Sequence, residues 1–394
     1  MNLLEKMSTL WSPKKAKKFY KVRNRDSSGS LNQQKDLTGR FCTNPFRQFD
    51  IAESGKVYCC CSSWLPTAMG DLKTETPSDV WNSDAAVTIR ESIHDGSFKY
   101  CDHKLCPSIQ NDSLPTLENV SNNPFYSAFK EIAEEKQTVI EGGPTFFNFC
   151  NDSSCNLSCP SCRVEKLILR EGPDFEERLA VNEKVIAAYL SEPTDRSFII
   201  NVTGSGDPFA SKIFRDFLFE LDGNDFPNMK VQLQTNGVLF TQKNWQKLEK
   251  IHKNLSVVLV SFDAATPETY AITRRGGRWD MLLENYKHLA AERKAGNLNW
   301  LRTDFVVQAD NYKEMPDYVR LIKSMGADRI YFSMIVDWGT WPKDIFESKC
   351  VWKQTHPEFD EFLKVLQDPI FDDPIVDLGN VTEYRTRALQ KMAS

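Results

Sequence analysis

Three closely spaced cysteines mark the part of the chain best suited to metal chemistry. Cys155, Cys159 and Cys162 stand in the segment CNLSCPSC, separated by three and then by two residues. Thiolates at this spacing can face one point on a tight loop, because the intervening residues only have to turn the backbone. Three thiolates leave one iron of a [4Fe–4S] cluster without a protein ligand, and such an iron can hold a small chelating molecule. The spacing therefore favours an iron–sulfur site with one open iron.

A structural zinc site is the alternative for this triplet, with Cys150 as the fourth ligand. Zinc is usually held by two pairs of ligands that lie well apart in the sequence, and a lone triplet is unusual for it. Iron and sulfur therefore fit this spacing better than zinc does.

A second group of six cysteines lies between residues 42 and 106. Three of them, Cys59, Cys60 and Cys61, are consecutive. Side chains of a strand alternate between its two faces, so Cys60 points away from its neighbours and the three cannot bind one ion together. Cys59 and Cys61 are then either core thiols or additional ligands. A zinc-stabilised module and an iron–sulfur cluster both fit this group.

Two residues near these groups receive separate predictions. His103 lies between Cys101 and Cys106, and it is the one histidine that we keep as a spare ligand. Cys350 stands alone, and we expect it to be a packing residue.

The composition is ordinary for a globular protein. The chain has 394 residues, of which 41% are hydrophobic and 26% charged, and its net charge is −5. This length suffices for one large domain and a smaller one, and the acidic balance gives no general attraction to nucleic acid. Eleven cysteines in a chain without a leader indicate a reducing compartment, where clustered thiols serve metal or redox chemistry more often than disulfides. We therefore expect a cytoplasmic protein without a nucleic-acid partner.

The N-terminal segment is basic. It contains Lys14, Lys15, Lys17, Lys18, Lys21, Arg23 and Arg25. This strip is either a docking surface for a membrane, an acidic partner or nucleic acid, or a solvated terminus. The apolar residues between 3 and 11 have helical spacing but form too short a stretch for a transmembrane span. The charges follow this apolar stretch, whereas those of a signal peptide precede it.

From about residue 145, short apolar runs alternate with helical patterns. The pattern predicts strands at 145–151, 197–203, 229–235, 256–262, 301–308 and 329–336. It predicts helices at 175–190, 211–221, 245–252, 279–295 and 315–326, the last ending at a glycine cap. Such alternation requires a parallel sheet with right-handed crossovers, as a barrel, a partial barrel or a doubly wound sheet. In all of these the chemistry lies at the carboxyl ends of the strands.

The part before residue 140 follows a different pattern. It has turn signals, short strand-like pieces such as KVYCCC, and helix candidates at 79–94 and 124–137. A small cysteine-dense unit of this kind usually depends on metal for its stability. We therefore predict a basic segment at 1–38, a cysteine-rich domain at 39–140, a core barrel at 141–340 and a C-terminal extension at 341–394 that covers the barrel.

The triplet and the segments after it resemble the radical S-adenosylmethionine superfamily. TGSGDPF (203–209) is similar to the glycine-rich turn that holds the methionine amino group in that family, and QTNG (234–237) resembles the turn after its third strand. VSFDAATPETYAITRRGGRWDMLLENY (260–286) resembles the segment after the fourth strand in SPASM-type members. VVQADN (306–311) corresponds to the region near the adenine. The resemblance covers residues 144–340 and implies an α/β fold with a partial (β/α)6 TIM-like barrel.

The resemblance also implies which residues contact S-adenosylmethionine. They are Gly204, Ser205, Gly206, Asp207, Asn236, Ser261, Asp263 and Gln308. The chain departs from the family at two of these positions or near them. Ser161 stands where the residue before the third cysteine is usually aromatic, and Asp207 replaces the commoner glutamate. Both changes leave the cluster ligands Cys155, Cys159 and Cys162 intact.

The upstream cysteines resemble a SPASM or twitch domain. SGKVYCCC (54–61) is similar to the hairpin of these domains in a register that selects Cys60, and residues 80–106 resemble their helix and closing cysteine pair. The resemblance implies one auxiliary [4Fe–4S] cluster on Cys42, Cys60, Cys101 and Cys106. In most relatives this domain follows the barrel, whereas here it precedes the barrel.

The resemblance implies an enzyme that reductively cleaves S-adenosylmethionine and uses the 5′-deoxyadenosyl radical to take hydrogen from a substrate. An electron donor of the flavodoxin or ferredoxin type is implied as partner. The short basic start leaves no room for a leader-binding winged-helix unit, which favours a small molecule such as a carbohydrate over a peptide. The expected net reaction is an oxidation, an epimerisation or a related rearrangement. The alternatives are a peptide- or protein-modifying maturase and a non-enzymatic metal-binding interaction protein.

Overall fold

The computed structural model describes residues 35–393, so the basic strip predicted at 14–25 lies outside the described residues. The chain divides into two compact units. Unit 1 comprises the described residues up to Asp50 together with Lys56–Pro144, and unit 2 comprises Ile51–Gly55 together with the residues from Thr145 onward. No helix within residues 35–393 is both long enough and apolar enough to cross a membrane.

Unit 2 is built on parallel strands. Side by side they are β4 (Phe146–Cys150), β5 (Phe198–Val202), β6 (Met229–Thr235), β7 (Leu255–Ser261), β8 (Leu301–Val307), β9 (Arg329–Met334) and β10 (Val376–Asp377). The first six are the predicted strands, and each end lies within two residues of its predicted position. The predicted parallel α/β architecture is therefore confirmed. β10 has only two residues, which give no period in the sequence.

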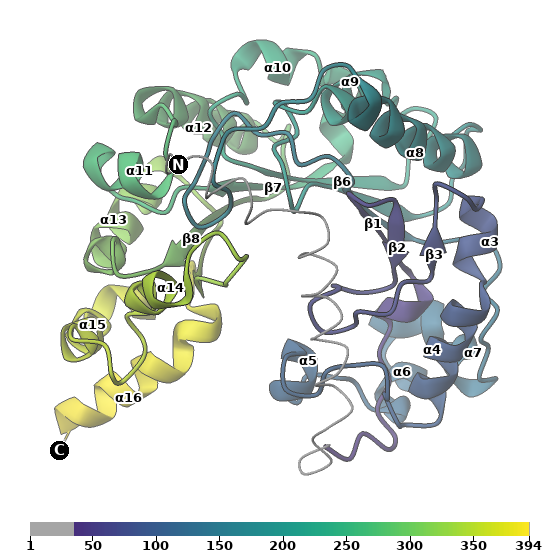
Figure 1. The fold of residues 1–394 in the computed structure, drawn as a ribbon, viewed down its shortest axis with the longest axis horizontal. Coiled ribbons are helices and arrows are strands. Elements are labelled where there is room, and N and C mark those ends of the chain that lie inside the picture. The colour runs from purple at the N-terminus through teal and green to yellow at the C-terminus, as the bar shows by residue number, and fades with distance from the viewer. Residues whose placement is uncertain (1–34, 394) are drawn as a thin grey trace, which may run out of the picture. The chain divides into compact units, whose positions relative to one another are not determined.

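Helices connect these strands along one face of the sheet (Figure 1). They are α8 (Pro173–Tyr189), α9 (Lys212–Glu220), α10 (Gln242–Gln246), α11 (Pro267–Thr273), α12 (Trp279–Lys294) and α13 (Met315–Met325). The ring of Phe147 in β4 lies 5.3 Å from that of Tyr189 in α8, centroid to centroid. Phe149 lies 5.1 Å from Phe217 in α9 in the same way. The apolar core of unit 2 therefore forms between this face of the sheet and its helices.

The predicted helix at 245–252 differs from the structure. α10 ends at Gln246, and a 3-10 helix follows at Glu249–Asn254. The buried side chains Trp245, Leu248 and Ile251 recur every three residues. That is the period of a 3-10 helix, which keeps the three side chains in one line, whereas an α-helix would spread them over about 120° of its circumference.

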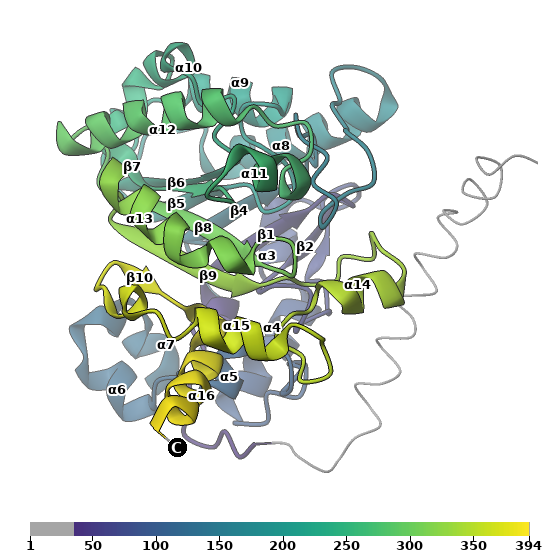
Figure 2. The ribbon, with the colours of Figure 1, turned by 90° about the vertical axis from the view of Figure 1, so that its left-hand side faces the viewer.

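The C-terminal segment folds at the β9 edge of the sheet. It forms α14 (Lys343–Lys349), α15 (Phe359–Val365), β10 and α16 (Thr382–Ala393), and Figure 2 shows α15 and α16 beyond β9. Because β10 pairs with β9, part of this segment extends the sheet instead of only covering it.

Unit 1 consists of short elements. They are β1 (Gln48–Ala52), which ends in unit 2, β2 (Lys56–Tyr58), β3 (Gly70–Asp71), α3 (Pro77–Trp81), α4 (Asp84–His94), α5 (Pro107–Gln110), α6 (Leu117–Asn122) and α7 (Lys130–Glu134). The helix predicted at 79–94 is divided into α3 and α4, because Ser83 caps α4 by accepting from the Ala86 N–H (3.2 Å). The helix predicted at 124–137 is a 3-10 helix followed by α7, and Ala133 is the only buried residue of the two elements. Without an apolar face to bury, this segment has little to stabilise a long helix.

Candidate functional site

The cysteine triplet lies in the loop after β4, at the carboxyl end of that strand. Cys155 and Cys159 are buried, and Cys162 is exposed. The N–H groups of Cys162 and Arg163 both donate to the Cys159 carbonyl (2.9 and 3.0 Å), which closes a tight turn. The Cys155 N–H donates to the Leu167 carbonyl (2.7 Å), so the loop folds back on itself. The structure thus contains the kind of loop that the spacing requires.

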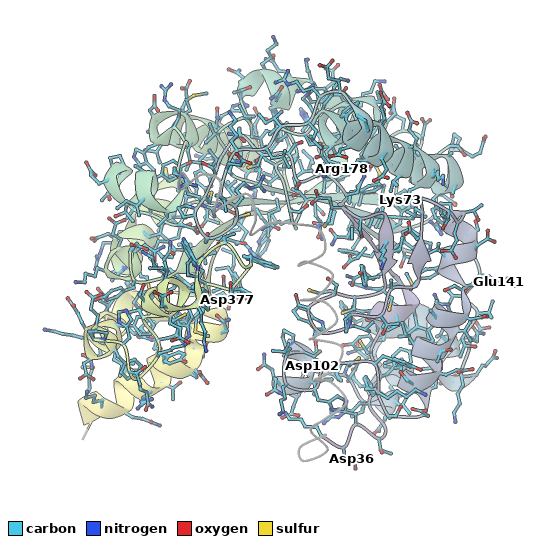
Figure 3. All side chains as sticks on the ribbon, viewed as in Figure 1. Asp36, Lys73, Asp102, Glu141, Arg178 and Asp377 are labelled. Atoms are coloured by element: carbon cyan, nitrogen blue, oxygen red, sulfur yellow. The ribbon has the colours of Figure 1, made fainter. Side chains whose placement is uncertain are left out.

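Asp152 fixes the start of this loop. Its fully buried carboxylate accepts from the Ser154 N–H (3.0 Å) and hydroxyl (2.8 Å). It also accepts from the Ser211 hydroxyl at the start of α9 (2.6 Å). Arg178 of α8, labelled in Figure 3, completes the set with a contact of 3.2 Å. The loop is therefore tied to two helices through one charged group.

Each thiol of the triplet faces a nitrogen donor of its own. In chain order the pairs are Cys155 Sγ with Asn236 Nδ2 (3.7 Å), Cys159 Sγ with Arg274 Nη1 (3.8 Å), and Cys162 Sγ with Arg163 Nη2 (3.6 Å). Two of these three donors carry a positive charge. Cations and N–H donors favour the thiolate, which is the form that binds a metal.

The buried thiols hold their protons in the absence of metal. Burial raises the pKa of the Cys155 thiol to about 12, and the Asp207 carboxylate adds to this effect. Burial also raises the pKa of Cys159, although the Arg274 guanidinium opposes it. Metal binding must therefore displace protons at these positions, and we expect it to become stronger as the pH rises.

Asp207, at the end of the turn after β5, joins two turns of the site. Its Oδ2 accepts from the Thr235 hydroxyl (2.7 Å) and the Asn236 N–H (3.0 Å). Its Oδ1 accepts from the N–H groups of Phe209 (3.0 Å) and Ala210 (3.2 Å). The carboxylate is fully buried and its acceptor capacity is used within the protein. Its predicted contact with S-adenosylmethionine stays a prediction, and its side chain ties the turn after β5 to the turn after β6.

Gly206 allows this turn to approach the cysteine loop. A Cβ atom at this position would lie 2.6 Å from the Asp152 carbonyl oxygen and 2.7 Å from the Ser154 carbonyl oxygen. Any side chain would therefore push the two backbones apart. The close packing of this turn against the cysteine loop is therefore sufficient to explain why residue 206 is a glycine.

The other predicted cofactor residues follow neighbouring strands at the same edge of the sheet. They are Gly204 and Ser205 after β5, Asn236 after β6, Ser261 and Asp263 at the end of β7, and Gln308 after β8. The carboxyl ends of parallel strands meet at one edge, so the structure brings these residues to the edge that carries the cysteine loop. Gln308 is buried, and its Oε1 has no hydrogen-bond partner within the described residues. A buried acceptor of this kind suits a donor group on a ligand.

Asp263 is held in an unusual backbone conformation, with φ at +58°. The Thr273 hydroxyl (3.2 Å) and the Asn311 amide (3.0 Å) donate to its carbonyl. Its carboxylate accepts from the Val306 N–H (2.7 Å) and pairs with Arg274 (2.8 Å). Burial raises the pKa of Asp263, and the Arg274 charge opposes the rise. Its predicted contact with the ribose stays a prediction.

Unit 1 arranges its cysteines around a cavity of about 90 Å³. The cysteines that line it are Cys42, Cys60, Cys101 and Cys106. Cys60 Sγ faces the Trp64 indole N–H (3.2 Å) and the Asn44 amide (3.5 Å). Burial raises the pKa of the Cys42 thiol to about 12, and the nearby Cys60 adds to this effect. The predicted ligand set of the auxiliary site is thus brought together in one place.

Cys59, Cys61 and His103 do not line this cavity. Cys59 is buried, and burial raises the pKa of its thiol. The ring nitrogens of His103 are buried without a hydrogen-bond partner within the described residues. The lone Cys350 is buried and faces the Phe346 carbonyl (3.2 Å), which fits a packing residue.

The spacing of the thiols bears on the zinc alternatives. Within residues 35–393, no three His, Cys, Asp or Glu side chains converge on one point as the ligands of a single metal ion do. Zinc draws its sulfur ligands to about 2.3 Å, whereas each iron of a cluster takes one thiolate and the thiolates surround a larger body. The four thiols of unit 1 line one cavity, as the second arrangement requires.

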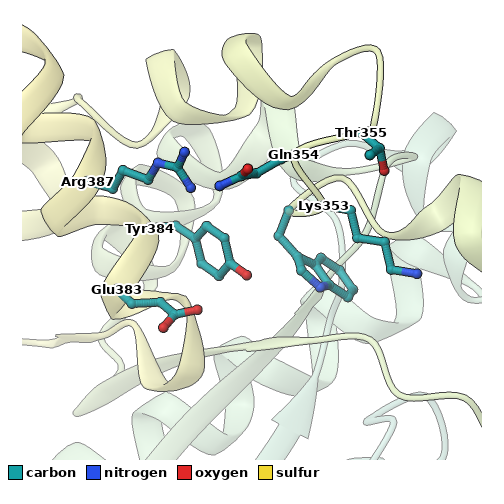
Figure 4. Close-up of a pocket in the computed structure, with 7 residues that line it drawn as sticks. Lys353, Gln354, Thr355, Glu383, Tyr384 and Arg387 are labelled. Atoms are coloured by element: carbon teal, nitrogen blue, oxygen red, sulfur yellow. The ribbon is translucent and has the colours of Figure 1, made fainter.

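A larger cavity lies in the C-terminal segment of unit 2, with a volume of about 610 Å³ (Figure 4). It is lined by residues 352–355 and by Glu383, Tyr384 and Arg387 of α16. None of these is a cysteine or a predicted cofactor residue. This cavity is therefore distinct from the residues that bear metal chemistry.

Comparisons with known families match both parts of the chain. Residues 153–299 match the model of the radical SAM superfamily, and residues 42–108 match SPASM, an iron–sulfur cluster-binding domain. The chain combines a radical SAM domain with a SPASM domain. The SPASM domain lies on the N-terminal side, and the family resemblance stated from the sequence is confirmed.

Several solved structures are similar to this chain. SuiB of Streptococcus suis bound to precursor peptide SuiA is 14% identical, with 86% of this chain and 73% of that chain covered and a TM-score of 0.41. Native anSMEcpe with bound AdoMet is 17% identical, with 58% and 59% covered and a TM-score of 0.39. Methylornithine synthase (PylB) is 14% identical, with 76% and 83% covered and a TM-score of 0.37. The match thus spans about three fifths of anSMEcpe. No curated protein sequence matches the chain.

The residues present fit the groups that these two domains imply. A radical SAM domain implies a [4Fe–4S] cluster and S-adenosylmethionine, and a SPASM domain implies an auxiliary iron–sulfur cluster. The triplet would hold the first cluster, and the unpartnered Gln308 Oε1 lies at the same edge of the sheet. The four thiols around the 90 Å³ cavity fit the second cluster.

The sequence did not single out Asp152, Arg163, Arg274, Asn44 or Trp64. Arg274 shows why, because it stands beside the exposed Arg275 in the run TRRGG. Neighbouring arginines have the same chemistry, and only the fold decides which one reaches a thiol: Arg274 faces Cys159 Sγ, whereas Arg275 donates to the Ser158 hydroxyl (3.2 Å) and the Val164 carbonyl (2.7 Å).

Proposed function

We propose that the chain is a radical SAM enzyme that takes hydrogen from a small, polar substrate. The observation that carries the proposal is the loop of three thiols, each facing its own nitrogen donor, at the carboxyl edge of a parallel sheet. When bound, the cluster and S-adenosylmethionine supply a 5′-deoxyadenosyl radical through reductive cleavage. The electron comes from an external donor of the flavodoxin or ferredoxin type.

The chain's own residues hold and shield the reacting groups. Cys155 and Cys159 are less than a tenth exposed, so the protein keeps water from two of the three ligand positions. Asp207 fixes the turns after β5 and β6 against each other, and Gly206 seats the first of these turns on the cysteine loop. A rigid edge of this kind places the substrate hydrogen within reach of the radical.

The face of the sheet opposite the helices supports a polar substrate. Alternate strand positions on that face carry hydrogen-bonding side chains beside the apolar Phe146, Ile199, Leu259 and Val306; the hydrogen-bonding ones are Asn148, Asn201, Gln232, Gln234, Arg302, Asp304 and Tyr331. The positions between them, which face the helices, are buried and mainly apolar. A parallel sheet whose two faces both pack against other elements is rich in apolar residues on both faces. The polar face is therefore suited to binding.

Two pairs on this face show how it could bind a substrate. Asn201 Nδ2 donates to Asn148 Oδ1 (2.7 Å). Arg302 forms a two-point pair with Asp304 (2.6 and 2.9 Å), and its guanidinium lies 4.6 Å from the Tyr331 ring centroid. Amides, paired charges and an aromatic ring are the groups that bind molecules with several hydroxyl groups. We infer a substrate such as a carbohydrate, with oxidation, epimerisation or a related rearrangement as the net reaction.

A product assay tests the proposal. Protein reconstituted with iron and sulfide without oxygen, then given dithionite and S-adenosylmethionine, is expected to form 5′-deoxyadenosine. A variant with alanine at Cys155, Cys159 and Cys162 is expected to form none, whereas Cys350→Ala is expected to match the wild type. If the triple variant formed as much 5′-deoxyadenosine as the wild type, the proposed enzymatic activity would be rejected.

Substrates labelled with deuterium test the substrate class. A deuterated sugar or polyol that transfers deuterium to 5′-deoxyadenosine would support the proposal. Transfer from peptides alone would favour the maturase, and the polar face would then have another role.

A further inference from the structure

We infer that Arg274 is a positioning residue that raises the reduction potential of the cluster held by the triplet, and that Asp263 limits this effect. The inference rests on the proposed function, because it requires a cluster at Cys155, Cys159 and Cys162. It assigns a role to a buried ion pair that contacts the cysteine loop.

Arg274 lies between a carboxylate and a thiol. Its Nη2 is 2.8 Å from Asp263 Oδ2, and its Nη1 is 3.8 Å from Cys159 Sγ. The side chain is only 14% exposed, and that of Asp263 only 6%. Water can therefore screen neither charge well, and the field of the guanidinium acts on the thiol at close range.

The pair is held in place from several directions. The Val306 N–H donates to Asp263 Oδ1 (2.7 Å), so the carboxylate is fixed on the side away from Arg274. Asn311 Nδ2 (3.0 Å) and the hydroxyl of Thr273 (3.2 Å) both donate to the Asp263 carbonyl. Thr273 directly precedes Arg274, so two consecutive residues are bound to Asp263. The guanidinium thus has one defined position relative to Cys159.

The sign of the effect follows from charge. One-electron reduction by a flavodoxin- or ferredoxin-type donor adds one negative charge to the cluster and moves no proton. A cation beside a ligand thiolate stabilises that more negative form, so Arg274 raises the potential. Asp263 carries the opposite charge and offsets part of this effect. The two residues must therefore act with opposite signs.

Arg163 is the less informative cation for a test. It faces the exposed Cys162, and it also donates to the backbone carbonyls of Ser153 and Ser205. Its replacement would disturb the loop itself, whereas Arg274 reaches the loop from outside it.

The test is a redox titration of the full-length reconstituted protein, followed by EPR spectroscopy. The relevant signal is the one that changes when S-adenosylmethionine is added. In Arg274→Gln we expect its midpoint to become more negative, with the reduced fraction at a fixed potential about tenfold lower, or about 59 mV for one electron. In Asp263→Asn we expect the midpoint to become more positive. Arg274→Lys keeps the charge and should stay close to the wild type.

The matched control is Arg278→Gln, four residues further along the chain. Arg278 is exposed and pairs with Asp280 (2.7 Å), so its loss should leave the midpoint unchanged. Iron content verifies that each variant keeps its cluster. If Arg274→Gln does not retain iron, the direction in which Asp263→Asn shifts the midpoint potential decides whether the inference holds.

Shifts of the same sign in Arg274→Gln and Asp263→Asn would overturn the inference, as would an unchanged midpoint in Asp263→Asn. A wild type that forms 5′-deoxyadenosine while these midpoints stay fixed would reject the role of Arg274 alone. A wild type without a cluster signal would reject the proposed function itself.

Discussion

The cysteine sites of the two units differ in the number of their thiols and in the side-chain donors that contact the sulfur atoms. In unit 1 four cysteines line one cavity, and the donors that face Cys60 are a neutral indole and a neutral amide. In unit 2 three cysteines share a loop, and two of the side-chain donors that face their sulfur atoms are guanidinium groups. Four thiolates complete the coordination of a cluster, whereas three leave an iron open. On this comparison we place the proposed cleavage chemistry in unit 2 and propose a supporting role for unit 1.

Arg90 of unit 1 and Arg274 of unit 2 are both largely shielded from water, and the two have different contacts. Arg90 in unit 1 is fully buried and donates to the carbonyls of Pro45 (2.9 Å), Trp81 (2.8 Å) and Thr138 (2.8 Å). Burial lowers the pKa of Arg90 to about 10. Arg274 in unit 2 contacts a carboxylate and a cysteine. The charge of Arg90 thus joins backbone segments, and that of Arg274 faces a predicted cluster ligand.

The largest expected effect is that of removing single thiols. Cys155→Ala should abolish 5′-deoxyadenosine formation and lower the iron content from about eight to about four per chain, since one of two clusters is lost. Cys101→Ala should likewise leave about four iron per chain, because it removes the auxiliary cluster of unit 1. Iron analysis and the product assay together measure both. A Cys155→Ala protein that keeps all its iron would contradict the division of ligands between the two sites.

Replacement of Arg90 tests the structural half of the comparison. Arg90→Met leaves several buried acceptors unpaired, so the free energy of unfolding should fall by roughly 3–5 kcal/mol. Denaturant unfolding measures this loss. The matched change Arg278→Met, at an exposed ion pair, should leave the free energy of unfolding close to that of the wild type. Equal losses in the two variants would show that Arg90 does not hold unit 1 together.

A smaller effect is expected at the auxiliary site. Trp64→Phe removes the indole N–H that faces Cys60 Sγ, and a lost donor destabilises the reduced cluster. The reduced fraction of the EPR signal that does not respond to S-adenosylmethionine should fall roughly threefold, or about 0.6 kcal/mol. Trp81→Phe is the control, because its indole donates to the Ile140 carbonyl (2.9 Å) instead of a thiol. A shift in the control as large as that in Trp64→Phe would argue against tuning by this hydrogen bond.

The smallest effect concerns pH and lies in unit 1. Burial lowers the pKa of His94, whose ring lies beside Phe41 and Phe46. The unfolded chain then binds the proton more tightly than the folded one, so stability present above the ordinary pKa of about 6.5 is lost as the pH falls below it. His94→Phe should show a shallower decline in unfolding free energy between pH 7 and pH 5. If the unfolding free energy of His94→Phe and of the wild type changed equally with pH, this contribution of His94 would be excluded.

The sequence predicted the strands of unit 2 well and some of its helices poorly, for physical reasons. Buried strands are short apolar runs with clear ends, and six of them appear where expected. The helix expected at 245–252 failed because three apolar residues spaced by three also suit a 3-10 helix. The single helix predicted at 124–137 does not form, because the segment has helix-forming residues but no apolar face to bury.

The cysteines of the site could be found from the sequence, because spacing and residue type carry most of their chemistry. The residues that face them could not. Arg274 reaches Cys159 across 115 positions of the chain, and Asn236 reaches Cys155 across 81. Such contacts depend on the packing of loops at one edge of the sheet, which no local pattern encodes.

The central claim is that the triplet holds a cluster with an iron open to S-adenosylmethionine, and EPR spectroscopy of the reduced protein tests it most directly. We predict two cluster signals, of which one changes when S-adenosylmethionine is added and is absent from Cys155→Ala. The other signal should be the same in both proteins. A spectrum that does not respond to S-adenosylmethionine, or a response that persists in Cys155→Ala, would contradict the account.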